Sequence, residues 1–332
     1  MYVLLVLTAL IGASLVYVYR FRGEARYDSP SQYFRKGWPV FSPLNCLLYL
    51  TTQRRGAQPI LDPTRFPELD SLRDNWQVIR DEAEALYRQE YFDATRRPGT
   101  PAYYDLGFRT FFKYGWSRFY LKWYGYTHAS ARRLCPQTTA LLERLPTLNG
   151  AMFALLPVGS KLTRHADPMA CSLRYHLGLV TPNSPECFIN IDGRNVHWRD
   201  GEVLMFDETY LHYARNDSAQ YRLILMCDVN RPTNPLGSLI NFFYKGLTRL
   251  SVVPNTDEDR RGLVNRLFSG MTPVLQASRR LKERNRPAYL LLKYSVNTLL
   301  VLLALGLIVG LVTLLADVTG FLTGPRATPV EA

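Results

Sequence analysis

The pattern of apolar and polar positions differs between the two halves of the chain. From Glu68 to Glu90, apolar residues recur at spacings of three and four, which predicts an amphipathic helix. A second, shorter helix is expected over Gln137–Leu145, because Pro136 stands where helices commonly begin. No low-complexity linker or internal repeat interrupts the region between residues 20 and 293. We therefore expect one folded domain there.

From about Tyr103 the pattern changes to short apolar runs typical of strands. Aromatic residues are dense between Tyr103 and Tyr126, and aromatic side chains favour strands. Asp192-Gly193 stands between two apolar runs and predicts a tight hairpin turn. Further strands are expected at Ala151–Leu156, Ser172–Val180, Glu186–Ile191, Asn195–Trp198, Glu202–Phe206 and Tyr221–Val229. Since no helical pattern separates these runs, the sequence predicts a mainly β protein of the sandwich or jelly-roll kind.

Two long uncharged segments lie near the ends of the chain. Tyr2–Tyr19 has 18 residues without a charge, and Tyr294–Ala316 has 23. A bilayer is crossed by about 20 apolar residues, so we expect two transmembrane helices that bracket the domain. No basic residues precede the first segment, which argues against a cleaved signal peptide. Phe41–Leu50 is apolar but too short to span, and we interpret it as a segment at the membrane surface.

The net charge fits this topology. The chain has 40 Lys and Arg against 28 Asp and Glu, a net charge of +12. Arg20, Arg22 and Arg26 follow the first uncharged segment, and a basic cluster from Arg279 to Lys293 precedes the second. By the positive-inside rule, residues 20–293 are expected in the cytoplasm. The excess charge then indicates apposition to an anionic membrane surface and not nucleic-acid binding.

These patterns divide the chain into six predicted segments. They are an anchor at 2–19, a membrane-proximal helical segment at 20–100, a β domain at 101–232, a helical segment at 233–293, a transmembrane helix at 294–316 and a tail at 317–332. Within 233–293, Leu236–Val253 combines apolar residues with Lys245 and Arg249. Two interpretations of it stay open: an interfacial helix, or a helix packed on the outside of the barrel.

The histidines carry the candidate chemistry. His165 and Asp167 are two positions apart, so they project from one face of an extended segment. His212 follows Asp167 with 44 residues between them. Two histidines and one carboxylate form the facial triad of non-haem Fe(II) oxygenases. Spacing alone leaves open that these are ordinary core histidines.

Arg222 is the second chemical feature of this region. It stands ten residues after His212 in the apolar run YRLILMCDV. A guanidinium that points inward from such a strand needs an anionic partner. Its planar fork suits a carboxylate, so the pattern predicts an anion-binding arginine beside the histidines.

The two richest stretches resemble a known family. HADPMACSLRYHLGLV and WRDGEVLMFDETYLHYARNDSAQYRLILMCDV are similar to the aspartyl/asparaginyl β-hydroxylases. These are Fe(II)/2-oxoglutarate dioxygenases with a double-stranded β-helix (jelly-roll) fold. The matching motifs run from about Tyr103 to Pro232. The flanking apolar segments and the HxDP form of the first motif make the chain similar to the lipid A 2-hydroxylase branch.

The resemblance implies a role for each matching residue. His165, Asp167 and His212 match the catalytic iron ligands, although the peptide-hydroxylating branch commonly has glycine at the position of Asp167. Arg222 matches the arginine that binds the distal carboxylate of 2-oxoglutarate. Arg174 and His176 match the pair near the cosubstrate's other carboxylate. Ala154 departs from the family, which often has serine there, so a different hydroxyl or a water has to complete the contact with Arg222.

The resemblance also implies an activity. The expected reaction adds a 2-hydroxyl to a secondary acyl chain of lipid A, using Fe(II), 2-oxoglutarate and O2, at the bacterial inner membrane with the domain facing the cytoplasm. Alternatives are hydroxylation of another lipid such as an ornithine lipid, hydroxylation of Asp or Asn in peptides, and a non-catalytic membrane-anchored binding module. The acyl chain, its length and the oligomeric state stay open.

Four further polar residues have weaker interpretations. His128 and His197 match no catalytic position and are interpreted as structural. Arg164 and Arg215 flank the expected iron ligands, and they either face lipid phosphates or lie on a solvated surface.

Overall fold

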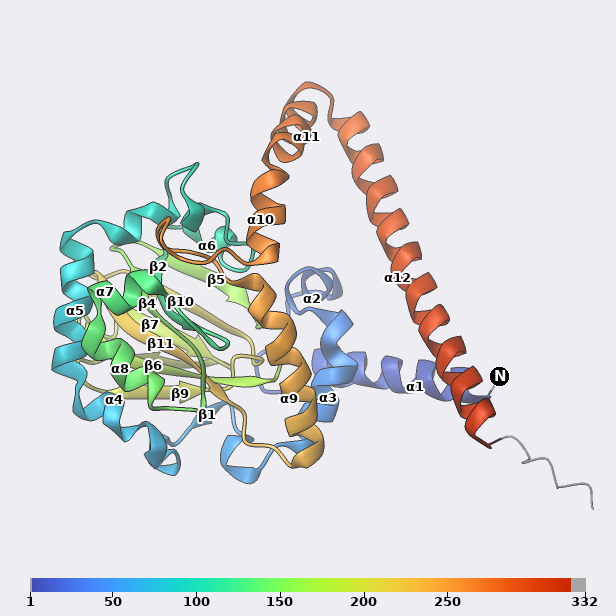
Figure 1. The fold of residues 1–332 in the computed structure, drawn as a ribbon, viewed down its shortest axis with the longest axis horizontal. Coiled ribbons are helices and arrows are strands. Elements are labelled where there is room, and N and C mark those ends of the chain that lie inside the picture. Colours follow the sequence, from blue (N-terminus) through green and yellow to red (C-terminus); the bar gives the residue numbers. More distant parts are fainter. Residues whose placement is uncertain (1, 324–332) are drawn as a thin grey trace, which may run out of the picture. The chain divides into compact units, whose positions relative to one another are not determined.

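The computed structural model describes residues 2–323, which fall into two compact units. The first unit extends to Ser269 and contains both β-sheets (Figure 1). The second unit begins at Gly270 and contains α11 (Thr272–Arg284) and α12 (Arg286–Thr323). Residues 324–332 of the predicted tail lie outside the described residues.

Two antiparallel sheets form the centre of the first unit. The larger sheet has the order β1-β9-β6-β11-β4-β2-β3, and the smaller has the order β5-β10-β7-β8. The larger contains β1 (Ile60–Leu61), β2 (Ser117–Trp123), β3 (Tyr126–Thr127), β4 (Leu148–Leu156), β6 (Ser172–Val180), β9 (Val203–Phe206) and β11 (Arg222–Asn230). The smaller contains β5 (Lys161–His165), β7 (Cys187–Ile191), β8 (Arg194–His197) and β10 (His212–Asn216).

The larger sheet is covered on both faces, because alternate residues of its central strands point in opposite directions. Phe153 of β4 packs in the cluster that includes the outer helices, whereas Met152 belongs to the cluster between the sheets. Ile189 of the smaller sheet joins this inner cluster, so the two sheets face each other. The inner faces of β6 and β11 carry the polar residues of the candidate site.

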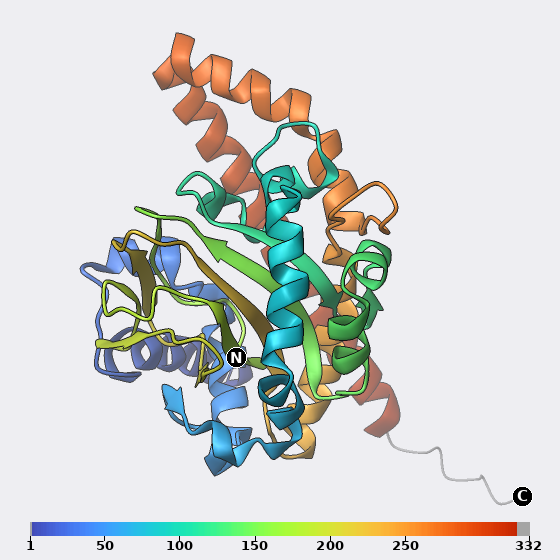
Figure 2. The ribbon, with the colours of Figure 1, turned by 90° about the vertical axis from the view of Figure 1, so that its left-hand side faces the viewer.

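Helices cover the outer face of the larger sheet. α5 (Trp76–Arg88) lies across that face, as Figure 2 shows, and buries Ile79, Ala83 and Leu86 at spacings of three and four. Between residue 70 and β4 the chain also forms α4 (Asp70–Asp74), α6 (Arg109–Phe112), α7 (Ala129–Leu134) and α8 (Pro136–Glu143).

A second group of helices lies beside the segment that follows β5. It consists of α1 (Tyr2–Val16), α2 (Pro30–Lys36), α3 (Ser42–Thr51) and α9 (Pro235–Thr248), and α10 (Leu263–Gly270) follows α9 along the chain. α3 contacts both α1 and α9. Leu48 of α3 and Tyr244 of α9 pack in one cluster with Met169, so these helices support the segment between β5 and β6.

Several elements expected from the sequence are confirmed. The helix from Glu68 to Glu90 is present as α4 and α5, interrupted at Asn75, and α8 corresponds to the second predicted helix. The six strands predicted from Ala151 onward correspond to β4, β6, β7, β8, β9 and β11. Asp192 and Gly193 have φ angles of 50° and 91° in the turn that joins β7 to β8. This left-handed pair is what the Asp-Gly hairpin motif predicts.

β5 and β10 are among the strands that were not predicted, and they carry both candidate histidine ligands. β5 reads KLTRH and β10 reads HYARN, so neither has the apolar run by which the other strands are recognised. Both are held by pairing with neighbours in the smaller sheet. The aromatic segment from Tyr103 to Tyr126 is also mixed: its first part forms short helical turns, and its second part forms β2.

The prediction of a mainly β protein is wrong, because helices make up about half of the chain. The strand-rich middle of the sequence dominated that prediction. The helices at both ends were assigned to membrane spans or to flanking segments, so they were not weighed as part of the fold.

The predicted transmembrane helices are also wrong. In residues 2–323, no helix combines the length and the apolar character that crossing a bilayer requires. α1 has 15 residues and is about 22 Å long, against a hydrocarbon core of about 30 Å. α12 is longer, but it too is not found to meet both requirements. The predicted inner-membrane localisation rested on these spans and is overturned with them.

Candidate functional site

The pairing of β5 with β10 brings two histidines together. His165 ends β5 and His212 begins β10, and the two residues are direct partners across the strands. Their ring centroids lie 4.3 Å apart. Antiparallel partners on one face of a sheet have neighbouring side chains, so the register itself sets this distance.

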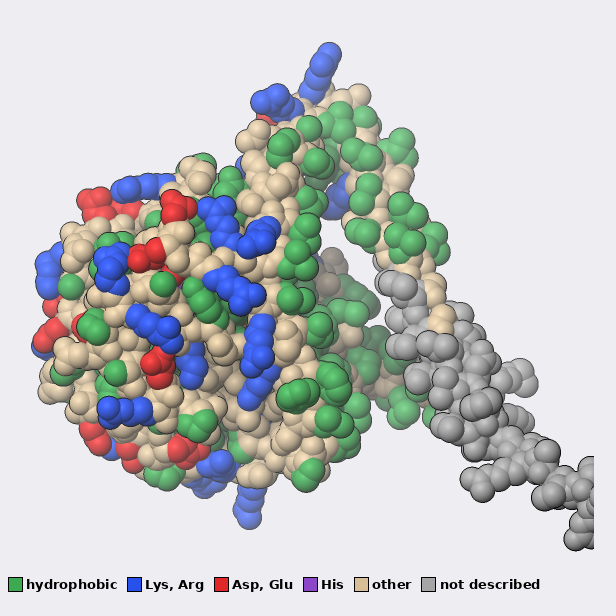
Figure 3. Space-filling model, in the orientation of Figure 1, with side chains coloured by type: hydrophobic (Ala, Val, Ile, Leu, Met, Phe, Trp, Pro, Cys, Tyr) green, Lys and Arg blue, Asp and Glu red, His purple; other side chains and the backbone are tan. Residues whose placement is uncertain are grey.

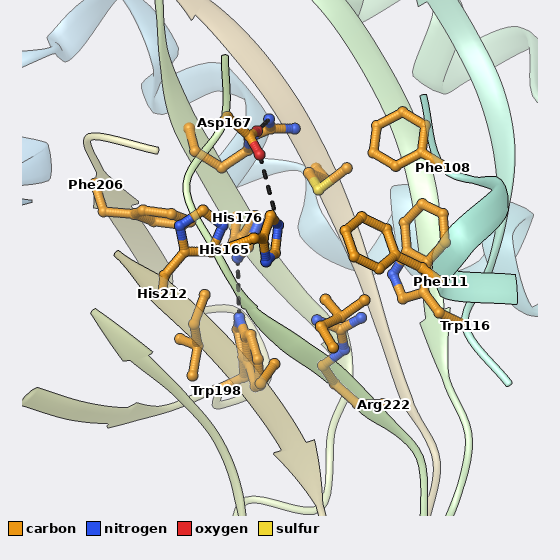
Figure 4. Close-up of a pocket in the computed structure, with 15 residues that line it drawn as sticks. Phe108, Phe111, Trp116, His165, Asp167, His176, Trp198, Phe206, His212 and Arg222 are labelled. Atoms are coloured by element: carbon orange, nitrogen blue, oxygen red, sulfur yellow. Dashed lines mark hydrogen bonds and ion pairs between the residues drawn. The ribbon is translucent and has the colours of Figure 1, made fainter. Parts of the chain in front are cut away.

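Asp167 completes a cluster of three possible metal ligands. One ligand atom from each of His165, Asp167 and His212 can be chosen so that all three lie within 4.8 Å of one another. Nε2 of His165 lies 3.5 Å from Oδ1 of Asp167 (Figure 4). Two imidazoles and a carboxylate at this separation suit an octahedral divalent ion with open positions.

Backbone carbonyls orient both imidazoles. Nδ1 of His165 donates a hydrogen bond to the carbonyl of Thr163 (2.7 Å), and Nδ1 of His212 donates to that of Tyr210 (2.9 Å). A proton held on Nδ1 leaves the lone pair of Nε2 available to a metal. Burial lowers the pKa of each imidazole to about 4, so both are neutral near pH 7, as metal ligation requires.

Arg174 holds the carboxylate of Asp167. Its guanidinium, on the inner face of β6, pairs with Asp167 (2.6 Å), with Asp228 (3.0 Å) and with Glu208. Burial alone would lower the pKa of Arg174, but these carboxylates outweigh burial and raise it. The predicted contact of Arg174 with a cosubstrate stays a prediction. In this structure Arg174 orients Asp167.

Arg222 is a buried cation without an acidic partner in the described part of the chain. Its side chain begins β11 on the inner face, and 2% of the residue is exposed. The guanidinium lies over the Trp198 ring (4.5 Å to its centroid) and donates a long hydrogen bond to the carbonyl of Ala154 (3.5 Å). Nε has no hydrogen-bond partner among the residues that the structure describes, and burial lowers the pKa of Arg222 to about 10. A small anion would satisfy this group.

His176 presents a second unpartnered donor. Trp198 donates its Nε1–H to Nδ1 of His176 (3.2 Å), which places the imidazole proton on Nε2. That Nε2 is buried and has no hydrogen-bond partner among the described residues. Burial, followed by the nearby Arg222, lowers the pKa of His176, so the ring stays neutral. Trp198 therefore organises both Arg222 and His176.

The remaining walls of the cavity are apolar. Phe108, Phe111 and Trp116 form an aromatic wall, and Phe111 lies 4.8 Å from His165 between ring centroids (Figure 4). Leu162, Ile189, Phe206, Ala214 and Met226 complete the lining. No hydroxyl side chain belongs to the described lining, so the hydroxyl expected to compensate for Ala154 is absent from it.

The comparison with protein families agrees with this site. Residues 73–232 match the model of the aspartyl/asparaginyl beta-hydroxylase family. The match covers 160 of the 332 residues, just under half of the chain. The match contains the candidate ligands, Arg222 and Trp198, so the resemblance seen in the sequence motifs is confirmed.

Individual relatives extend the comparison. The chain is 28% identical over 226 residues to an ornithine lipid ester-linked acyl 2-hydroxylase of Rhizobium tropici, covering 66% of this chain and 77% of the relative. It is 34% identical over 184 residues to human aspartyl/asparaginyl beta-hydroxylase, covering 53% of this chain and 23% of the relative. A solved prolyl-4-hydroxylase of Pseudomonas putida is 16% identical, with 48% of this chain and 87% of that chain covered at a TM-score of 0.34. The chain thus spans less than a quarter of the human relative's length.

The other residues singled out in the sequence lie outside the cavity. Nε2 of His128 contacts the carbonyl of Val253 (3.0 Å), and His197 accepts a hydrogen bond from Arg199 (3.2 Å). Arg164 pairs with Asp28 (3.1 Å), and Arg215 pairs with Asp217 (2.9 Å). None of the four lines the cavity.

Sequence reasoning missed three contributors to the site. Trp198 was named only as the last residue of an expected strand, although it contacts Arg222 and His176. Glu208 shares Arg174 with Asp167, and burial raises the pKa of Glu208 to about 8. Phe111 was counted among strand aromatics. Of these three residues, only Glu208 could have been found from the sequence, because it lies in the FDE run four residues before His212.

Proposed function

We propose that this hydroxylase-family chain is an Fe(II)- and 2-oxoglutarate-dependent enzyme that adds a 2-hydroxyl group to an acyl chain of a membrane lipid. The observation that carries the proposal is the uncompensated Arg222 in the same cavity as the His165, Asp167 and His212 cluster. A metal site and an anion site that share one cavity suit a metal-bound oxoacid.

The residues present fit both groups. His165, Asp167 and His212 would hold Fe(II), which with 2-oxoglutarate and O2 supplies the oxidising power for hydroxylation of an unactivated carbon. Arg222 would bind the distal carboxylate of 2-oxoglutarate. Nε2–H of His176 is the unpartnered donor that would reach a second carboxylate oxygen. Arg174 holds the carboxylate of Asp167 in place.

The aromatic wall supports an acyl substrate. Phe108, Phe111 and Trp116 face the candidate ligands across the cavity, and none of them offers a charge to a peptide carboxylate. An apolar chain gains contact area against these rings and excludes water from the reacting carbon.

Two lipids are candidates for the substrate. The HxDP motif supports a secondary acyl chain of lipid A, as the resemblance implied. The Rhizobium tropici relative acts on an ester-linked acyl chain of ornithine lipid according to its name, which favours that lipid as the second candidate. Both would undergo the same chemistry at the same site.

The exposed side of α3 and α9 is a suitable surface for meeting such a lipid. On α9, the apolar residues Leu236, Leu239, Phe243 and Leu247 recur along one exposed stripe, while Gly237 and Asn241 are buried on the opposite side. Leu47 and Leu50 of α3 are likewise exposed, Leu50 by 83%. Figure 3 shows apolar side chains gathered along α9, with Lys and Arg beside them.

The charges around this apolar stripe favour an anionic lipid surface as the occupant. Residues 229–256 contain no Asp or Glu and include Lys245 and Arg249. Residues 29–61 also contain no acidic residue and include Arg35, Lys36, Arg54 and Arg55. Apolar residues flanked by basic ones bind the headgroup region of anionic lipids.

The activity is tested with purified protein, Fe(II), 2-oxoglutarate and each lipid. We expect succinate formation coupled to one added oxygen on lipid A or on ornithine lipid, detected by mass spectrometry. His212→Ala should abolish both products. Hydroxylation of Asp or Asn peptides alone would contradict the lipid proposal, and absence of Fe(II) binding would indicate a non-catalytic module.

The lipid surface is tested by flotation with vesicles of anionic or of neutral phospholipid. Phe243→Glu should reduce binding to the anionic vesicles about tenfold or more, since Phe243 is 62% exposed on the stripe. Val158→Glu is the matched control, because Val158 is also exposed but belongs to the loop after β4. Equal binding by both variants, or self-association in place of flotation, would contradict the proposal.

A further inference from the structure

We propose that Arg22, which lies outside the family match, is a positioning residue for the metal site. The inference rests on the proposed function, since it concerns the same three ligands. At the sequence level Arg22 was grouped with surface charges that follow an apolar segment. In the structure its side chain is 8% exposed and forms an ion pair with Asp207.

Arg22 is held on several sides. Its Nη2 donates to Oδ2 of Asp207 (2.7 Å) and to the hydroxyl of Thr209 (3.0 Å). The guanidinium also lies between the rings of Tyr49 (3.4 Å) and Tyr210 (4.0 Å). Cation–π contacts with two rings and a charge-assisted hydrogen bond together fix the position of a guanidinium. The N-terminal segment is thus fastened to the turn at Asp207–Tyr210.

That turn contacts the candidate ligands through its backbone. The carbonyl of Tyr210 accepts the hydrogen bond that orients His212, and the carbonyl of Glu208 accepts the N–H of Asp167 (2.9 Å). The carboxylate of Glu208 pairs with Arg174, which in turn pairs with Asp167. A displacement of this turn would therefore move two ligands together.

Arg22 is one of two cations that neutralise the buried carboxylate of Asp207. The other is Arg231 (2.8 Å), and the carboxylate is fully buried. Burial alone would raise the pKa of Asp207, but Arg231 and Arg22 together hold it at about 2. Asp207 also accepts hydrogen bonds from the N–H and the hydroxyl of Thr209, which shape the turn. Loss of Arg22 would leave this network short of one cation.

A second attachment follows directly in the chain. The N–H groups of Glu24 and Ala25 both donate to Oδ1 of Asp192 (2.7 and 2.8 Å). The N–H of Asp192 in turn donates to the carbonyl of Leu211 (2.9 Å), the neighbour of His212. The N-terminal segment therefore supports the residues immediately before His212 by two separate routes.

The test compares Arg22→Gln, Arg22→Lys and the control Arg20→Gln in the full chain. Arg20 is exposed and lies two residues away, so its change removes the same charge without the buried contacts. The probe is Co(II) without cosubstrate, whose affinity and visible absorption report ligand geometry without turnover. Each variant is first checked for folding by circular dichroism and thermal melting.

We expect Arg22→Gln to weaken Co(II) binding about tenfold or more and to alter the absorption spectrum, because removal of groups that orient metal ligands has effects of this size. Arg20→Gln should match the wild type. Unchanged Co(II) affinity and spectrum in folded Arg22→Gln would overturn the inference, whatever its melting temperature. If that variant does not fold, the Co(II) affinity and spectrum of Arg22→Lys are compared with the wild type in its place. This variant keeps the positive charge but loses the planar guanidinium. A wild type that binds no Co(II) would instead refute the proposed metal site.

Discussion

The guanidinium of Arg222 lies over the ring of Trp198, and the indole N–H of that tryptophan donates to His176. One aromatic side chain thus supports the two groups that present unpartnered donors to the cavity. In this cavity the buried charge of Arg222 destabilises the folded protein until an anion binds to it. Removal of Arg222 should therefore raise the stability of the protein and lower its affinity for an anion.

Arg222→Met should stabilise the metal-free protein while it abolishes 2-oxoglutarate binding. The substitution removes a buried charge that has no acidic partner, and we expect a gain of roughly 1–3 kcal/mol in the free energy of unfolding. Urea denaturation and calorimetric titration with 2-oxoglutarate in the presence of Co(II) measure the two effects.

Arg118→Met is the matched control for this prediction. Arg118 is equally buried in the larger sheet but pairs with Asp105 (2.7 Å), so its loss leaves a buried carboxylate unpaired. We expect a loss of about 3 kcal/mol or more. If Arg222→Met were as destabilising as Arg118→Met, Arg222 would be a structural residue and not an anion site.

Asp167→Ala should weaken metal binding about 100-fold or more and leave the fold intact. The variant removes one of three ligands, while Arg174 keeps Glu208 and Asp228 as partners, so no buried charge is left alone. Asp217→Ala serves as the control, because Asp217 pairs with Arg215 at the exposed end of the same region. Co(II) affinity that is equal in both variants would argue against Asp167 as a ligand.

Phe111→Ala should affect the lipid and spare the cosubstrate. Phe111 packs on His165 from the aromatic wall and offers no hydrogen-bond donor to a carboxylate. We expect KM for the lipid to rise about tenfold, with KM for 2-oxoglutarate within about twofold, since loss of apolar contact costs 1–3 kcal/mol. Leu106→Ala, at an exposed position nearby in sequence, should change neither constant. A rise confined to KM for 2-oxoglutarate would contradict this assignment of the wall.

His128 should make the stability of the fold depend on pH. Burial lowers its pKa to about 4, whereas an unfolded histidine titrates near 6.5. Between these values the unfolded chain binds one more proton, so the free energy of unfolding falls as the pH decreases from about 6.5 to about 4. Above pH 7 this contribution is fully present.

Urea denaturation at several pH values checks this dependence in the wild type and in His128→Gln. Glutamine keeps a donor for the carbonyl of Val253 but cannot titrate. The stability of the variant should therefore fall less steeply with acid than that of the wild type, with a constant difference above pH 7. Parallel curves across the whole range would show that His128 does not contribute.

Local sequence patterns were sufficient for many elements of the fold. The 3.6-residue spacing of Ile79, Ala83 and Leu86 determines α5, and Asp192-Gly193 determines the turn between β7 and β8. They failed for β5 and β10, because strands held by pairing with neighbours need no apolar run of their own. They also failed for the uncharged end segments, where absence of charge was equated with membrane insertion.

The sequence by itself determined the family, the motif residues His165, Asp167 and His212 and the anomaly of Arg222, because the chemistry of these side chains and their spacing are local properties. Only the tertiary structure decided what surrounds them. Strand register placed His165 beside His212, Trp198 came to support Arg222, and a segment 185 positions distant in sequence brought Arg22 to Asp207. Contacts of that range depend on how the sheets and helices pack, which no local pattern encodes.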